Sequence, residues 1–179
     1  MAHLDWDENI PKSTEYADYY EGYIELITEA NVIQQLIQQG QQVYALIGQL
    51  DDQQADYRYA EEKWSVKEVI GHLIDTERIM AFRALCVARG EQQSLPGFDQ
   101  DEYVRQAWFS KRSLQSLAAE YDAQRNANIS LFSSFNTQQI GQAGTADGSD
   151  ISVRALAYII AGHERHHLRI LEERYGVSF

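Results

Sequence analysis

Apolar side chains recur at steps of three and four residues in four stretches of the chain, and polar or glycine-rich segments separate these stretches. Such spacing places the apolar side chains on one face of an α-helix. The predicted helices run from about 31 to 50, 65 to 89, 113 to 135 and 152 to 176. Four amphipathic helices of about 20 residues predict an all-α fold, a four-helix bundle, with an irregular helical array as the alternative.

Residues that typically begin or end a helix flank these stretches. Asn31 can cap the first helix, and Ser65 with Glu68 three positions later forms a capping-box pattern at the second. Gly90 follows the second helix and Gly176 follows the fourth, and glycine is common just past a helix end. The helix boundaries are therefore predicted by local chemistry as well as by periodicity.

The segments between and before these helices carry turn signals. Residues 1–30 are polar, acidic and rich in tyrosine, so we expect an irregular N-terminal arm that packs on a bundle domain spanning 31–179. The connection over 91–112 contains a Pro-Gly turn, and so long a connection in a compact domain is often functional. Residues 139–150 are expected to be a loop, and no segment shows the alternation typical of a strand.

Charge and composition exclude several classes of function. The net charge of −12 disfavours binding to nucleic acids or to anionic membrane surfaces. No apolar run approaches the roughly 18 residues of a membrane span, and the N-terminal residues do not resemble a secretory signal. Cys86 is the single cysteine, which excludes an intramolecular disulfide and fits a reducing compartment. We therefore expect a single-domain cytoplasmic protein.

Histidines interrupt the apolar face of the last predicted helix. His163 and His167 are four residues apart, so their imidazoles lie one helical turn apart on the same face. This spacing suits two ligands of one metal ion. Two core histidines satisfied by hydrogen bonds are an equally open interpretation, because any buried imidazole needs a partner.

The segment from His163 to His167 also matches the H-E-x-x-H motif of zinc proteases. Ile170 stands where the extended motif has glycine, and no histidine follows His167, so a protease is a distant alternative. A third ligand would have to come from elsewhere in the chain. His72 lies at the edge of the apolar arc of the second helix and is not selected by periodicity alone, while His3 is expected to be a solvated terminal residue.

Four further side chains are candidates near such a site. Glu164 could act as a general base or orient an imidazole. Glu77 lies inside an apolar arc, so it could be a ligand or support a ligand, or it could form a buried ion pair with an arginine. Asp99 and Tyr103 belong to the long connection and could reach the metal, or could simply close a structural loop.

Several stretches resemble the DinB/YfiT-like family of metal-dependent enzymes. They are YIELI, ADYRYAEEKWSVKEVIGHLIDTERIMAFRALCVARG, LPGFDQDEYV and AYIIAGHERHHLRIL, and together they extend from about Tyr23 to Tyr175. The resemblance implies a four-helix bundle, often a homodimer. It also implies that His72, His163 and His167 bind one divalent metal ion, usually zinc or nickel.

An open coordination position would make such a site catalytic, because a metal held by three neutral histidines can activate a water molecule or a thiolate. The family resemblance implies a metal-dependent enzyme that acts on a small molecule, as a hydrolase or as an S-transferase with a low-molecular-weight thiol cosubstrate. The alternative is a non-catalytic bundle that binds a metal or another ligand.

Overall fold

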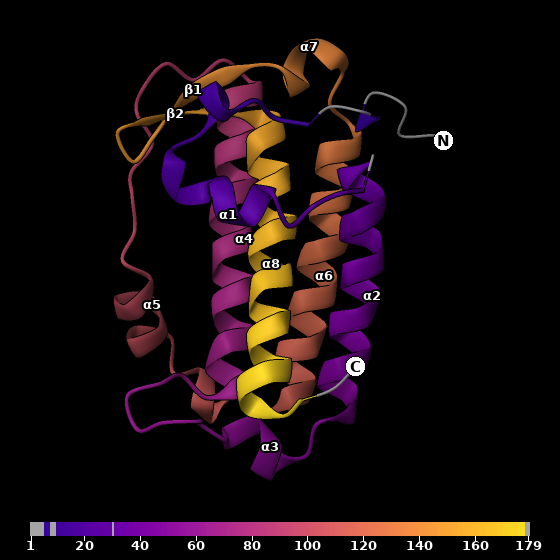
Figure 1. Ribbon diagram of the computed structural model, residues 1–179, viewed down its shortest axis with the longest axis vertical. Helices are drawn as coiled ribbons and strands as arrows, with labels where there is room; N and C mark the ends of the chain where they lie inside the picture. The colour runs from indigo at the N-terminus through magenta and orange to yellow at the C-terminus, as the bar shows by residue number, and fades with distance from the viewer. Residues whose placement is uncertain (1–5, 8–9, 30, 178–179) are drawn as a thin grey trace.

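Four long helices lie side by side in the computed structural model (Figure 1). They are α2 (Val32–Gln49), α4 (Val66–Ala88), α6 (Leu114–Ser133) and α8 (Val153–Tyr175). The structure describes residues 6–7, 10–29 and 31–177. The predicted all-α four-helix bundle is confirmed, and each long helix begins and ends within two residues of its predicted bounds.

The predicted caps explain these helix boundaries. The Asn31 side chain accepts hydrogen bonds from two backbone N–H groups of the first turn of α2. Ser65 and Glu68 form a capping box at the start of α4. Gly176 ends α8 in the left-handed conformation, with φ of 67°, which glycine adopts without steric cost. Local chemistry therefore set the ends of the helices, as expected.

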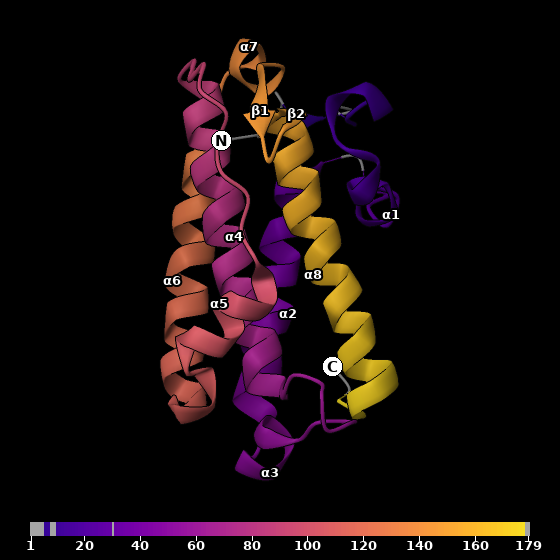
Figure 2. The same cartoon turned by 90° about the vertical axis from the view of Figure 1, so that its left-hand side faces the viewer.

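Helix α8 carries much of the buried apolar surface. It packs against α4 and α2, and α6 packs against α2 and α4, so each long helix contacts two others (Figures 1 and 2). Most of the first half of α8 is buried. Any polar side chain on the inward faces of α4, α6 or α8 must therefore find its partner inside the bundle.

The N-terminal segment lies against α8. It contains short 3₁₀ turns at Ser13–Glu15 and Asp18–Tyr20 and the one-turn helix α1 (Glu21–Ile24). Trp6 is buried and its indole N–H donates to the Phe132 carbonyl oxygen at 3.1 Å. The expected arm is thus partly helical where it is described. Its residues 1–5, 8–9 and 30 lie outside the described part of the chain.

The expected absence of strands was wrong. Strands β1 (Ala143–Ala146) and β2 (Ser149–Ser152) form an antiparallel hairpin that leads into α8. The two residues between them, Asp147 and Gly148, have φ of 52° and 73°. Asp-Gly is a strong two-residue hairpin signal, but the strands are too short and too polar to show apolar alternation.

Three short helices fill the remaining connections. They are α3 (Asp52–Asp56), α5 (Gln100–Ala107) and α7 (Thr137–Ile140), and the 3₁₀ turn Phe109–Lys111 follows α5. The long connection between α4 and α6 is therefore partly helical. Within the described residues, no helix is both long enough and apolar enough to cross a lipid bilayer.

Candidate metal centre

Three histidines from two helices converge in the bundle; His72 and His163 are buried and His167 is half-buried. His72 comes from α4, and His163 and His167 come from successive turns of α8. One ring nitrogen of each lies within 4.8 Å of the other two. The Nε2 atoms of His72 and His163 are 2.9 Å apart. The edge position of His72 on its helix therefore faces α8, which periodicity on one helix could not establish.

A glycine precedes the first histidine of each helix and allows a neighbouring element to approach closely. A Cβ atom on Gly71 would lie 2.3 Å from the Phe109 ring, and one on Gly162 would lie 2.0 Å from the Tyr23 carbonyl oxygen. Both distances are too short for an ordinary contact. The two glycines let the Phe109 turn and α1 close around the histidines.

Side chains that the sequence did not bring forward surround the imidazoles. Tyr23 on α1 contacts His163 edge to face at 5.4 Å between ring centroids. Trp64 stands 4.7 Å from His72. The Thr76 hydroxyl lies 3.4 Å from His72 Nδ1, one helical turn away. If His72 carries its proton on Nδ1, that contact leaves the Nε2 lone pair facing the other histidines.

Burial keeps these imidazoles neutral at pH 7. It lowers the pKa of His72 to about 4 and that of His167 to about 3. Burial, reinforced by the neighbouring imidazoles, holds the pKa of His163 well below its usual range. Neutral imidazoles carry a free ring-nitrogen lone pair, which is the form that binds metal ions.

The donor set fits a divalent metal ion. Zinc–nitrogen distances of about 2.0–2.1 Å at tetrahedral angles place two ligand nitrogens about 3.3 Å apart. The observed separations, from 2.9 Å to no more than 4.8 Å, lie around that value. His167 Nδ1 is buried and has no hydrogen-bond partner. Hydrogen bonding within the protein therefore does not account for the cluster as a satisfied core.

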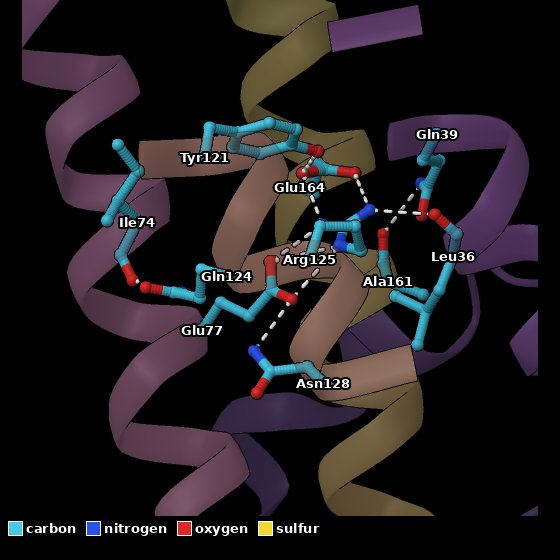
Figure 3. Close-up of polar contacts among 10 residues, drawn as sticks. All are labelled: Leu36, Gln39, Ile74, Glu77, Tyr121, Gln124, Arg125, Asn128, Ala161 and Glu164. Atoms are coloured by element: carbon cyan, nitrogen blue, oxygen red, sulfur yellow. Dashed lines mark hydrogen bonds and ion pairs between the residues drawn. The ribbon is translucent and has the colours of Figure 1, made fainter. Parts of the chain in front are cut away.

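Glu77 and Glu164 belong to a different cluster, centred on Arg125 of α6 (Figure 3). Arg125 Nη2 donates to Glu77 Oε2 at 2.8 Å and to Glu164 Oε2 at 2.7 Å. Asn128 donates to Glu77 at 3.0 Å, and the Tyr121 hydroxyl donates to Glu164 at 2.6 Å. Of the two interpretations of Glu77, the structure shows the buried ion pair with an arginine.

The charges of this cluster balance one another within the protein. Burial raises the pKa of Glu164, and Arg125 opposes that shift. Burial acts to lower the pKa of Arg125, but Glu164 and Glu77 hold it well above its usual range. Although Glu164 follows His163 in the chain, its side chain points toward α6. A general-base role for Glu164 stays a prediction, and its carboxylate is already bound by two donors.

Asp99 and Tyr103 have local roles in the structure. Asp99 Oδ1 accepts hydrogen bonds from the N–H groups of Asp101 and Glu102, so Asp99 caps α5. Tyr103 is 47% exposed and its ring packs against Phe98 at 5.4 Å. The connection does reach the cavities beside the histidines, through Phe98, Gln100 and Asp101.

Two sizeable cavities border the histidines, one at His163 and the other at His167. The larger, of about 370 Å³, reaches His163 between α1, α4, α8 and the hairpin. The smaller, of about 220 Å³, reaches His167. The larger is lined by Ala17, Tyr19, Tyr20, Tyr23, Thr76, Met80, Arg83, Phe98, Gln100, Ala146, Asp147, Ser149, Ile159 and His163. The histidine cluster therefore borders space that a small molecule could enter. The remaining candidate histidine, His3, lies outside the described residues.

Residues 35–171, most of the chain, match the family model of the DinB superfamily. This chain belongs to the DinB superfamily. The match covers all three histidines and all four long helices except the first turn of α2 and the end of α8. The family resemblance found in the sequence is therefore confirmed.

Two known proteins are similar to this DinB-superfamily chain. One is a protein of Oceanobacillus iheyensis named "Putative metal-dependent hydrolase OB0413", 23% identical over 123 residues, which are 68% of this chain and 70% of that protein. The other is a solved structure of YfiT from Bacillus subtilis, described as "a probable metal-dependent hydrolase with an unusual four-helix bundle topology". It has 17% identity and a TM-score of 0.70, over 96% of this chain and 95% of that one. At this identity the second likeness supports the fold.

Proposed function

We propose that this protein is a metal-dependent hydrolase of a small molecule, with one divalent ion held by His72, His163 and His167. The observation that carries the proposal is the convergence of three neutral imidazoles, two of which border cavities: His163 borders the larger and His167 the smaller. The names of the Oceanobacillus and Bacillus relatives support it. Imidazole donors suit zinc and nickel, and we propose one of these as the ion.

The residues around the cluster would prepare the site for this chemistry. Bound there, a divalent ion with three neutral ligands would lower the pKa of a coordinated water molecule. Thr76 would hold the tautomer of His72. Tyr23 and Trp64 would limit the access of bulk water to the imidazoles. The Arg125 cluster would fix α8 against α4 and α6 and so keep the histidines in register.

A thiol-dependent transferase is the second candidate. The observation that favours it is the pair of cavities, which border His163 and His167 separately and could admit a thiol and its acceptor. Because cavities border the histidines, the alternative of a non-catalytic bundle with its metal ion sealed from small molecules is less favoured. The protease alternative is not favoured, because the residue that occupies the general-base position of its motif, Glu164, is bound to Arg125. Homodimerisation and a cytoplasmic location stay predictions.

The first test is the metal content of untagged protein, measured by mass spectrometry after purification and after equilibration with zinc or nickel. We expect about one ion per chain in the wild type and a loss of that ion in His72→Ala and His163→Ala. His166→Ala is the matched control, because His166 lies on the same helix but outside the cluster. A wild-type protein that takes up neither ion would contradict the proposal.

Loaded protein would then be assayed on ester, amide and electrophilic substrates with and without a low-molecular-weight thiol. Turnover without thiol would support the hydrolase. Turnover that requires thiol, with thioether formed and no hydrolysis product, would support the transferase.

A further inference from the structure

The larger cavity contains a buried cation that the metal site does not use. Arg83 on α4 is only 2% exposed and lines this cavity together with Thr76 and Met80. His72, Thr76, Met80 and Arg83 are spaced at four, four and three residues, which places them on one face of the helix. The same wall therefore runs from the histidine cluster to the guanidinium.

The hydrogen bonds of Arg83 are incomplete. Its Nη2 donates to the Pro96 carbonyl oxygen at 2.6 Å, and its Nη1 makes a weak contact with Met80 Sδ at 3.6 Å. Its Nε is buried without a partner. Among the described residues, no carboxylate lies within ion-pair distance of Arg83, although the equally buried Arg125 binds two. A buried guanidinium with no carboxylate in contact is unfavourable, and the one carboxylate that the structure shows lining this cavity, Asp147, lies beyond ion-pair distance of Arg83.

We propose that Arg83 binds a carboxylate or phosphate group of the substrate, whose apolar body lies along the cavity toward His163. This inference rests on the proposed function, because it supplies the substrate class for the same site. The guanidinium fork matches either oxyanion. Tyr20 stands beside Arg83: burial raises the pKa of its hydroxyl, and the charge of Arg83 and a hydrogen bond from its guanidinium oppose that shift. Its neutral hydroxyl is a second donor.

The size and charge of the cavity narrow the substrate further. A rise of 1.5 Å per residue separates His72 from Arg83 by about 16 Å along α4. The Arg83 side chain reaches back to Met80, which shortens the distance from its guanidinium to the histidines. The volume of about 370 Å³ suits a small organic molecule. The Phe98 ring, 5.9 Å from the Arg83 guanidinium, and Ile159 form an apolar wall. Asp147 also lines the cavity and is exposed, so it would repel a second anionic group. We therefore expect a substrate with one anionic group and an apolar body.

Calorimetric titration of the full-length protein would test this proposal with defined probes. The probes are arylalkanoates from phenylacetate to 4-phenylbutyrate, their neutral amides, and phenyl phosphate. We expect the wild type to bind one anion class at least about tenfold more tightly than the matched neutral compound. Whether carboxylate or phosphate binds more tightly identifies the anionic group. No preference for any anion would overturn the inference.

Three variants on α4 separate the effect of the Arg83 charge in the cavity from the effect of the protein's overall charge. Arg83→Met should lose the anion preference, and Arg83→Lys should keep part of it. Arg78→Met, which removes an exposed arginine of the same helix, should keep all of it. Retention of the preference in folded Arg83→Met would overturn the inference. If the Arg83 variants do not fold, a crystal structure of the wild type with the tightest probe decides, because the anion either contacts Arg83 or does not.

His72→Ala distinguishes this inference from the proposed function. Anion preference that persists in His72→Ala assigns the anion to Arg83 even if the protein proves to bind no metal ion. Preference that is lost in His72→Ala but kept in Arg83→Met would place the anion on the bound ion. That result would overturn the inference while supporting the metal site.

Discussion

Two buried polar clusters in the same bundle differ in whether the protein completes them. Around Arg125, two carboxylates, a tyrosine hydroxyl and an asparagine amide satisfy one another (Figure 3). Around His72, three imidazoles converge with no carboxylate among them, and His167 Nδ1 has no partner. Both clusters include residues of α8: His163 belongs to the histidine cluster, and the next residue, Glu164, belongs to the Arg125 cluster.

The contrast shows how to separate structure from function among buried polar residues. A buried polar cluster with a complete set of partners needs no ligand to account for it, because each polar group has recovered the hydrogen bonds it lost on leaving water. An incomplete set at the wall of a cavity indicates a group supplied from outside the chain. Arg83 and the histidines are both of this second kind. The comparison can be tested by changing each cluster in turn.

Removal of the central cation should have the largest effect. Arg125→Met would leave Glu77 and Glu164 buried without a counter-charge, and we expect unfolding free energy to fall by about 3–5 kcal/mol. Urea denaturation measures this, with the exposed Arg78→Met as the control. Adding Glu77→Gln and Glu164→Gln to Arg125→Met should recover much of the loss. A small effect of Arg125→Met alone would mean that Arg125 is not needed to balance the buried charges of Glu77 and Glu164.

Gly162→Ala should be the next most damaging change. The new Cβ would meet the Tyr23 carbonyl oxygen, and a backbone atom cannot move aside as a flexible side chain can. We expect a loss of about 3 kcal/mol and displacement of α1 from the histidines. Gly48→Ala in α2 is the matched control, because a Cβ there meets nothing within 4 Å. The control should be neutral or stabilising by up to about 1 kcal/mol.

Metal binding should stabilise the protein through the open cluster. Zinc at about 100 times its dissociation constant should raise the unfolding free energy by about 2.7 kcal/mol. His72→Ala should abolish this gain, whereas His166→Ala should retain it. Thermal or urea denaturation with and without zinc gives the comparison. Equal stabilisation of His72→Ala and wild type would show that zinc binds elsewhere.

The metal-free protein should lose stability in acid because of the same histidines. The folded-state pKa of His72, about 4, lies below the value of about 6.5 for an unfolded histidine. The unfolded chain therefore binds protons first, and the stability present above pH 6.5 is lost as pH falls toward 4. Between pH 7.5 and 5.0, His72→Gln should lose about 2 kcal/mol less than wild type. Urea denaturation at the two pH values checks this, and equal losses would contradict it.

The smallest effect expected is that of Thr76→Val. This change removes the hydroxyl beside His72 Nδ1 while keeping the branched shape. Zinc affinity should fall about tenfold, and the metal-free stability should change by less than about 1 kcal/mol. Competition with a chelator measures the affinity. If the unfolding free energy falls by more than the free energy of zinc binding, Thr76 contributes mainly to packing.

Local pattern alone predicted much of the bundle. The four long helices and their caps at Asn31 and Ser65 were predicted because capping and periodicity depend on residues a few positions apart. The shared face of His163 and His167 followed from the same geometry. The hairpin was missed although Asp147-Gly148 is a local signal, since its strands carry too little alternation to stand out from a loop.

Family resemblance, and not periodicity, brought His72 into the candidate set, because its position at the edge of a helix can face either neighbour. Tyr23 and Arg83 gave no local signal at all. Glu77 could equally have been a ligand until Arg125, 48 positions away, was found beside it.

The sequence by itself thus determined which segments are helical, where they end and which of their faces are apolar, since these properties arise within a few turns of chain. Only the tertiary structure decided which buried polar groups are satisfied, because their partners come from other helices. That distinction separates Arg125, whose charge is balanced inside the protein, from the histidines and Arg83, whose partners we propose to be a metal ion and a substrate anion.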